Sequence, residues 1–217
     1  MNGAAPGPGE LPAGDFSAWM DDTLLALRGE RPADVPCGEC TACCRSSQFV
    51  HIGPDETDAL AHIPSALLFA APRLPTGHVL MGYDRDGRCP MLVDDRCSIY
   101  EHRPRTCRTY DCRVFPAAGV FPDDDPSKAA IAQRARRWRF DEGSDDARVR
   151  HAAVHAAARF VERHHTELPA EAAPVTTTQL AVAAVVLHDL FLWVEPASGG
   201  TALVEPAVEA VRLRLRR

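Results

Sequence analysis

The sequence has little positive charge and almost no lysine. Of its 24 basic residues only Lys128 is a lysine, and 30 acidic residues give a net charge of −6. Proteins that bind nucleic acid or an anionic membrane surface need a surplus of positive charge. The arginines that surround Trp138 lie among many acidic residues, so we interpret them as a solvated helix face. We therefore expect no nucleic-acid partner and no membrane partner.

Long apolar runs and an export signal are also missing from this sequence. The most apolar segment, 180–194, is interrupted by His188 and Asp189 and is too short to cross a bilayer. Residues 1–14 are mainly Gly, Pro and Ala, with neither the basic residues nor the apolar run of a secretory signal. We interpret them as a disordered tail and expect a cytoplasmic protein. Eight cysteines in a reducing compartment then indicate metal binding or redox chemistry rather than a disulfide framework.

The common catalytic and nucleotide-binding motifs are missing as well. The sequence has no G-x-G-x-x-G after a strand, no Walker loop and no G-x-S-x-G. A dithiol oxidoreductase built on Cys37 and Cys40 is disfavoured, because no thioredoxin-like βαβ pattern accompanies them. His151 and His155 share a helix face, but Ala152 stands where a metalloprotease needs its glutamate. We therefore interpret the two histidines as a solvated or partly buried pair.

The cysteines define the organisation of the chain, because all eight lie between Cys37 and Cys112. We divide the chain into a disordered tail (1–14), an N-terminal helix with the cysteine-cluster segment (15–116), a linker (117–128) and a C-terminal helical region in which a short hairpin can form (129–217). The expected fold class is α+β, mainly helical. It is a single domain, with a cysteine-rich, loop-dominated metal-binding segment packed by N- and C-terminal helices.

Regular elements are expected to be few around the cysteines. Asp15 is a suitable N-cap, and apolar residues at helical spacing predict an amphipathic helix over 16–27. Within the cysteine segment, residues 49–52 and 78–81 are predicted strands, and a helix is predicted to run to about Ile63. Loops account for the rest of this segment.

The cysteine-free C-terminal region is predicted to be mostly helical. Thr176 and Gln179 have the spacing of a capping box at the start of an apolar helix. Residues 191–195 and 201–205 flank a Ser-Gly-Gly turn and can form a hairpin. The predicted helices cover 129–140, 145–165, a segment from about 180, and the tail after Pro206.

The first cysteine cluster has the spacing of a metal site. It contains Cys37, Cys40, Cys43 and Cys44. Two cysteines three residues apart can turn both thiolates toward one metal, and Gly38 permits the tight turn that this requires. A tetrahedral zinc needs four ligands, and a cubane iron–sulfur cluster takes one cysteine on each iron. Because Cys44 is adjacent to Cys43, it is an awkward fourth ligand, and the cluster is an incomplete site.

A second group of cysteines supplies further ligands. It contains Cys89, which precedes a proline, and Cys97, Cys107 and Cys112. Eight thiols suffice for one four-thiolate site with four other cysteines, or for two such sites. The span also contains ligand candidates other than cysteine, namely Glu39, His51, His102 and Asp111. Oxygen or nitrogen ligands of this kind would favour iron or zinc with an open position.

Two arginines bracket Cys107 in the sequence. Arg103 and Arg108 could stabilise thiolate or cluster charge, or bind an anionic substrate. We favour the simpler interpretation that they pair with the carboxylates of Asp94 and Asp95.

Taken together, these motifs resemble the YkgJ-type cysteine cluster proteins, a family described as zinc- or iron-chelating. The motifs are Cys37-x2-Cys40-x2-Cys43-Cys44, Cys89-Pro-x-Leu92, Cys97-x-Ile99-Tyr100 and Arg103-Pro104-x2-Cys107-Arg108-x-Tyr110. Their order and spacing agree with the family from Cys37 to Phe115. The cluster is also distantly similar to that of flagellin lysine N-methylases, in which cysteines are thought to hold an iron–sulfur cluster.

The resemblance implies a metal centre, with an iron–sulfur cluster favoured over zinc as the cofactor. The ligand candidates carried over by position are Cys37, Cys40, Cys43, Cys44, Cys89, Cys97 and Cys107, and Cys112 extends the set. The first-choice ligands are Cys37, Cys40, Cys43 and Cys89. Two functions stay open: an exposed iron or cluster that performs redox or substrate-activating chemistry, and a zinc-stapled structural or interaction module without catalytic activity. The sequence leaves the substrate, the partner and the presence of any enzymatic activity undecided.

Overall fold

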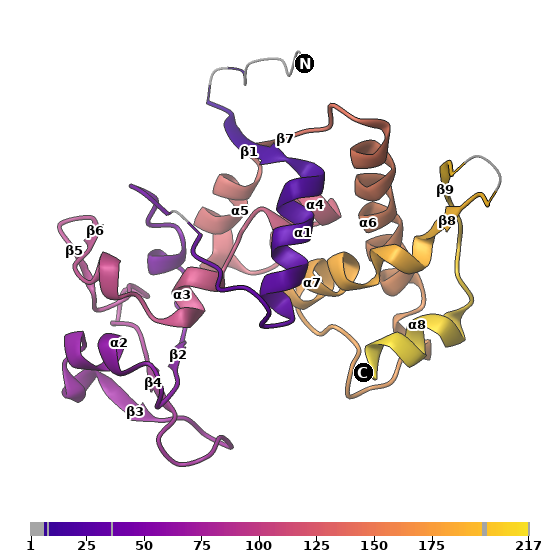
Figure 1. Ribbon diagram of the computed structural model, residues 1–217. Coiled ribbons are helices and arrows are strands. Elements are labelled where there is room, and N and C mark those ends of the chain that lie inside the picture. The colour runs from indigo at the N-terminus through magenta and orange to yellow at the C-terminus, as the bar shows by residue number, and fades with distance from the viewer. Residues whose placement is uncertain (1–6, 8, 36, 197–198, 217) are drawn as a thin grey trace. The chain divides into compact units, whose positions relative to one another are not determined.

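The computed structural model describes residues 7, 9–35, 37–196 and 199–216 (Figure 1). The expected α+β, mainly helical class is confirmed. The chain divides into two compact units, each assembled from separate stretches of sequence. The first unit contains the described residues of 1–31, 112–122 and 135–217, and the second contains those of 32–111 and 123–134.

The first unit is built mainly from helices. Its helices are α1 (Phe16–Leu27), α4 (Val114–Ala118), α6 (Asp145–Arg163), α7 (Thr177–Leu187) and α8 (Val208–Leu215), with the short 3₁₀ helices η5 (His165–Glu167) and η6 (His188–Phe191). Its strands are β1 (Leu11–Asp15), β7 (Trp138–Asp141), β8 (Leu192–Val194) and β9 (Thr201–Leu203). The N-terminal helix α1 thus belongs to the same unit as the C-terminal helices, and the units do not follow the sequence segments 15–116 and 129–217.

Helix starts in this unit lie where the capping residues predict them. The Asp15 side chain accepts a hydrogen bond from the Ala18 amide over 2.8 Å, so α1 begins at Phe16. Thr176 and Gln179 form both halves of a capping box at the start of α7. Each cap satisfies amide groups that have no partner inside the helix.

The core of the first unit lies where α6 packs on α4 and α7 (Figure 1). Small buried side chains such as Ala157 and Ala184 let the helices approach closely. Phe160 and Phe191 fill the space beside them in an edge-to-face pair with ring centroids 5.5 Å apart. His151 stacks on Phe16 at 4.2 Å, so this histidine is partly buried by packing against α1.

The helix predicted over 129–140 is wrong in its second half. Helix α5 covers Ala129–Ala135, and Trp138–Asp141 form β7, which pairs in parallel with β1. The Leu11 amide donates to the Arg137 carbonyl over 2.7 Å. This pairing joins segments far apart in the sequence and overrides the local helical pattern. Strand β1 also includes residues 11–14 of the predicted tail, whereas residues 1–6 and 8 of that tail lie outside the described residues.

The C-terminal hairpin is confirmed. Strands β8 and β9 pair antiparallel, with Trp193 opposite Ala202. Residues 197–198 of the connecting turn lie outside the described residues. The last helix, α8, begins at Val208, two residues after Pro206. No helix in the described ranges combines the length and apolar character needed to span a membrane.

The second unit consists of short elements joined by loops. Its strands are β2 (Val50–Ile52), β3 (Leu68–Ala70), β4 (Val79–Met81), β5 (Leu92–Val93) and β6 (Arg96–Cys97). Its helices are α2 (Thr57–His62), α3 (Arg105–Thr109) and α5, with the 3₁₀ helices η1 (Cys43–Arg45), η2 (Ser65–Leu67), η3 (Tyr100–His102) and η4 (Pro126–Lys128). The first three strands form an antiparallel sheet in the order β2-β4-β3, and β5 and β6 form a separate hairpin.

Apolar side chains from several of these short elements form one core in the second unit. Ile52 and Met81 from the sheet are almost fully buried and lie with Ile99 and Met91 from the loops. Three cysteines, Cys89, Cys97 and Cys107, pack against this core. The core therefore fixes the positions of three cysteines that the sequence predicts as metal ligands.

Candidate metal centre

Seven of the eight cysteines line one cavity of about 630 Å³ in the second unit. They are Cys37, Cys40, Cys43, Cys44, Cys89, Cys97 and Cys107. All seven are half-buried, and within the described part of the chain no cysteine forms a disulfide. The first cysteine group and three members of the second, which are separated in the sequence by β2, α2, β3 and β4, therefore meet around a single space.

A tight turn and a short helix place the first group on the cavity wall. The Cys40 amide donates to the Cys37 carbonyl over 2.9 Å, and Gly38 adopts a φ of 55° within this turn. The Gly38 amide also donates to the Tyr100 hydroxyl over 3.2 Å. Cys43 and Cys44 begin η1, and both line the cavity although they are adjacent in the sequence.

The second group is held by a backbone hydrogen bond, a hairpin and a helix. The Cys89 amide donates to the Cys44 carbonyl over 2.7 Å, which joins the two groups directly. Cys97 lies in β6, and the hairpin turns through Asp94 and Asp95, whose φ values of 48° and 58° fit a two-residue type I′ turn. Cys107 lies in α3, which begins directly after Pro104.

Burial raises the pKa of four of the thiols that line the cavity. Burial, followed by the neighbouring thiols, raises the pKa of Cys44 and of Cys107 to about 12. Burial also raises the pKa of Cys37 and of Cys89. In each of these four cases the charge of Cys97 contributes to the rise. Cys97 lines the same cavity as these four thiols, and a nearby positive charge such as a metal ion would favour their ionised forms.

One such positive charge is a buried arginine. Arg103, only 7% exposed, donates from its Nη1 atom to the Cys37 Sγ over 3.3 Å. Its Nη2 atom donates to Asp34 at 2.9 Å, and its guanidinium carbon lies 3.8 Å from the centre of the Tyr100 ring. The Coulombic effect of this arginine lowers the pKa of Cys37 and opposes the larger effect of burial.

The predicted pairing of Arg103 and Arg108 with Asp94 and Asp95 is wrong. Arg103 pairs with Asp34, and Arg108 donates to the backbone carbonyls of Arg103 and Glu101, both over 2.8 Å. It is Arg45 that forms the ion pair with Asp95. Because Asp34 precedes the cysteine motifs in the sequence, spacing within those motifs gave no signal of this contact.

Cys112 is placed differently from the other cysteines. It belongs to the first unit, where the Trp138 Nε1 atom donates to its Sγ over 3.2 Å, and it does not line the cavity. The contact with Trp138 depends on β7, which the sequence did not predict. Cys112 thus has a local partner of its own.

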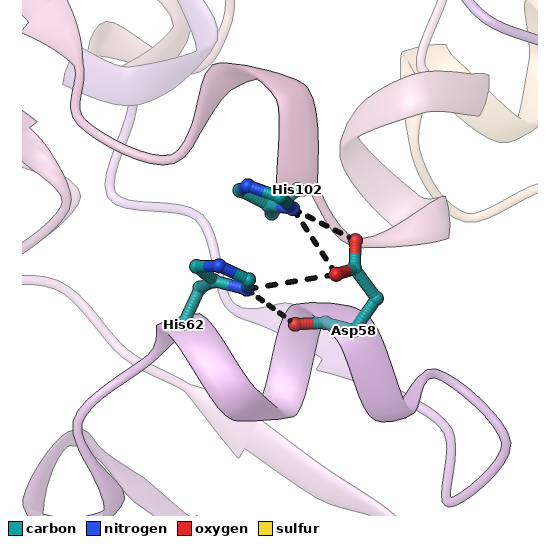
Figure 2. Close-up of side chains that lie close together, drawn as sticks. All are labelled: Asp58, His62 and His102. Atoms are coloured by element: carbon teal, nitrogen blue, oxygen red, sulfur yellow. Dashed lines mark hydrogen bonds and ion pairs between the residues drawn. The ribbon is translucent and has the colours of Figure 1, made fainter.

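The candidate ligands other than cysteine do not all lie at the cavity. Glu39 lines the cavity, whereas Asp111 does not. The His51 Nε2 atom lies 2.9 Å from the His78 Nδ1 atom, so these two imidazoles share a hydrogen bond. His102 lies with Asp58 and His62 on the surface of the same unit (Figure 2).

Comparison with known proteins supports this reading of the cysteines. The model of the CxxCxxCC family, described as "Putative zinc- or iron-chelating domain", matches residues 36–135. No curated protein and no solved structure matches the chain. The matched range contains all eight cysteines and agrees with the family expected from the motifs. Residues 36–135 are therefore similar to the CxxCxxCC family, whose description as a zinc- or iron-chelating domain supports metal binding by these cysteines.

Proposed function

We propose that the cavity of the second unit holds an iron–sulfur cluster bound by thiolates. The observation that carries the proposal is the convergence of seven thiols on one space of about 630 Å³. A single tetrahedral zinc uses four ligands, and its site is compact. A cluster needs a larger space surrounded by thiolates, which are also the soft ligands that iron–sulfur clusters select.

The cysteines that line the cavity are the candidate ligands of this cluster. Cys97 lies in β6 on the wall of the cavity and packs against the same apolar core as Cys89 and Cys107. We therefore place Cys97 among the ligands, together with members of the first cluster and Cys89. Cys112 is left out, because it does not line the cavity and, in the first unit, its Sγ accepts a hydrogen bond from Trp138.

A bound cluster would supply electron transfer or activation of a ligand at an open iron. The protein itself would surround the cluster with a positive charge and an apolar lining. Arg103 offsets negative charge at Cys37, and apolar side chains such as Val50, Met81 and Ile99 line the cavity and lower its polarity. These are the factors by which a protein adjusts the reduction potential of a cluster.

A zinc-stapled structural module is the second candidate. The strands of the second unit are only two or three residues long, and α2 and α3 have six and five residues. Short elements of this kind gain much of their stability from a structural metal. In this case the metal would be zinc, held by four thiolates, and no reaction would follow.

The two candidates differ in metal content and in colour. The test is anaerobic purification of the full chain, followed by analysis of iron, zinc and acid-labile sulfide and by a visible absorption spectrum. Iron with sulfide, and visible absorption that fades on reduction, is the result we expect. Zinc without sulfide or colour would overturn the cluster and establish the structural module.

A further inference from the structure

A second group of metal-ligand side chains lies outside the cysteine cavity, on the surface of the same unit. Asp58 and His62 are one turn apart on α2, and His102 comes from η3 (Figure 2). One ligand atom from each side chain lies within 4.8 Å of the other two. Because α2 packs against η3, the group depends on the fold and not on sequence proximity alone.

The distances in this group are close to those between ligands of one metal ion. The His102 Nδ1 atom lies 2.9 and 3.1 Å from the two carboxylate oxygens of Asp58. The His62 Nδ1 atom lies 3.6 Å from the Asp58 Oδ1 atom. Two tetrahedral ligands at about 2.1 Å from a zinc ion are separated by roughly 3.4 Å. All three atoms could contact one ion once the two imidazole rings rotate out of their parallel stacking, so that their in-plane lone pairs converge.

The two imidazoles already face the same carboxylate. Their rings are stacked, with centroids 3.5 Å apart and planes inclined by 4°, and both Nδ1 atoms are directed toward Asp58 (Figure 2). The His62 Nδ1 atom also lies 2.8 Å from the Asp58 carbonyl oxygen. Binding an ion would replace this contact and the hydrogen bond between His102 and Asp58, and it would require both Nδ1 atoms to be unprotonated.

We propose that Asp58, His62 and His102 form a second metal site that binds a divalent transition-metal ion of the zinc type through two imidazoles and one carboxylate. The three side chains are 62%, 41% and 39% exposed, so water can occupy the remaining coordination position. Three protein ligands with one open position are typical of zinc sites that bind exchangeable ligands, whereas structural zinc sites are closed. The donors are nitrogen and oxygen, in contrast to the thiolates of the cavity.

The site goes beyond the proposed cluster and does not depend on it. Its residues do not line the cavity, and its donors differ chemically from the thiolates. Loss of metal from one site can therefore be measured while the other is intact.

The test is a calorimetric titration of the full chain, as purified, with Zn²⁺ at pH 7.5. The variants are His102→Ala, His62→Ala and the milder Asp58→Asn. The matched control is His78→Ala, which removes a histidine from the other stacked pair, His51 with His78. Near-ultraviolet circular dichroism confirms that each variant keeps its fold, and a Co²⁺ spectrum reports the donor type.

We expect the native chain and His78→Ala to bind one more equivalent of Zn²⁺ than His102→Ala does. His62→Ala and Asp58→Asn should bind that equivalent more than about tenfold more weakly than the native chain, since even loss of an outer-shell partner costs about 10- to 100-fold in affinity. The Co²⁺ complex should lack sulfur-to-metal charge transfer. Equal stoichiometry and affinity in the native chain and all three site variants would overturn the proposal.

Discussion

The guanidinium of Arg103 donates a hydrogen bond to the Sγ of Cys37 over 3.3 Å, from a side chain that is only 7% exposed. The same side chain donates to the carbonyls of Tyr100 and Val35, at 2.8 and 3.3 Å, and to the Asp34 carboxylate. Arg103 thus connects the chain that enters the first cysteine cluster to the segment that carries Cys107. Because guanidinium stays charged at every accessible pH, it is a permanent positive charge beside a thiol.

Replacing Arg103 with Gln is expected to destabilise the second unit and to lower the reduction potential of a bound cluster. Lost hydrogen bonds to a charged donor cost about 1.5–3 kcal/mol in the free energy of unfolding. Loss of the positive charge makes addition of an electron less favourable. The measurements are denaturant unfolding and a redox titration.

Arg105→Gln is the control for this prediction, because Arg105 is 63% exposed and pairs with Asp55 on the surface. An exposed pair contributes about 0–1 kcal/mol. If both variants have the same stability and the same potential, Arg103 has no special relation to the cavity.

Metal binding by the cavity is expected to strengthen as pH rises. The pKa of Cys44 and of Cys107 is raised to about 12, so both are protonated near neutral pH in the metal-free chain. Each thiol that becomes a ligand must release its proton, and the apparent affinity then rises about tenfold per pH unit for each proton released. Calorimetric titrations of the metal-free chain with Zn²⁺, in buffers of different ionisation enthalpy, count these protons. An affinity that does not change between pH 6 and pH 8 would exclude thiol ligands.

Sequence reasoning located the elements whose signals are local. The N-cap at Asp15, the capping box of Thr176 with Gln179 and the two cysteine groups all depend on residues a few positions apart, and the structure places the first two as expected. The cysteine spacing also identified the domain that the family comparison matches.

Features that depend on distant segments could not be found in this way. Strand β7 forms because β1 pairs with it, and the local pattern around Trp138 resembles a helix. The partner of Arg103 is Asp34, which lies outside every cysteine motif. The contact of Cys112 with Trp138 is equally invisible in the local sequence, since it depends on β7 and its pairing with β1. The spacing of the cysteines alone cannot distinguish Cys112 from the other seven.

The first unit is expected to lose stability in mild acid through His188. This side chain is 6% exposed, its Nδ1 atom lies 2.7 Å from the Val185 carbonyl oxygen, and burial lowers its pKa below the usual 6.5. The unfolded chain therefore binds more protons than the folded chain once the pH falls below about 6.5. The stabilisation is complete above that pH and declines as the pH falls toward the lowered pKa.

His188→Gln should reduce this pH dependence, because glutamine can still donate a hydrogen bond but carries no titrating group. Denaturant unfolding at pH 7.5, 6.0 and 5.0 measures the pH dependence of the free energy of unfolding. The control is His165→Gln, because His165 is an exposed histidine of the same unit. Identical slopes against pH for His188→Gln and the native chain would contradict this role of His188.

Helix α7 is expected to depend on its cap. Thr176→Ala removes the hydroxyl that accepts from the Gln179 amide over 3.2 Å and should lower the free energy of unfolding by about 1 kcal/mol. Thr178→Ala, inside the helix, is the matched control and should have a smaller effect, since alanine favours helix. Equal losses in chemical denaturation would show that the capping box contributes no stability.

The most direct test of the central claim compares the metal content of Cys97→Ser with that of Cys112→Ser. Cys97 lines the cavity of the second unit, whereas Cys112 belongs to the first unit and accepts a hydrogen bond from Trp138 there. Both variants are purified anaerobically with the native chain, and bound metal and sulfide are measured per chain. We predict that Cys97→Ser loses most of its metal and that Cys112→Ser keeps the native amount. Full retention by Cys97→Ser, or loss confined to Cys112→Ser, would contradict the assignment of the cavity as the metal centre.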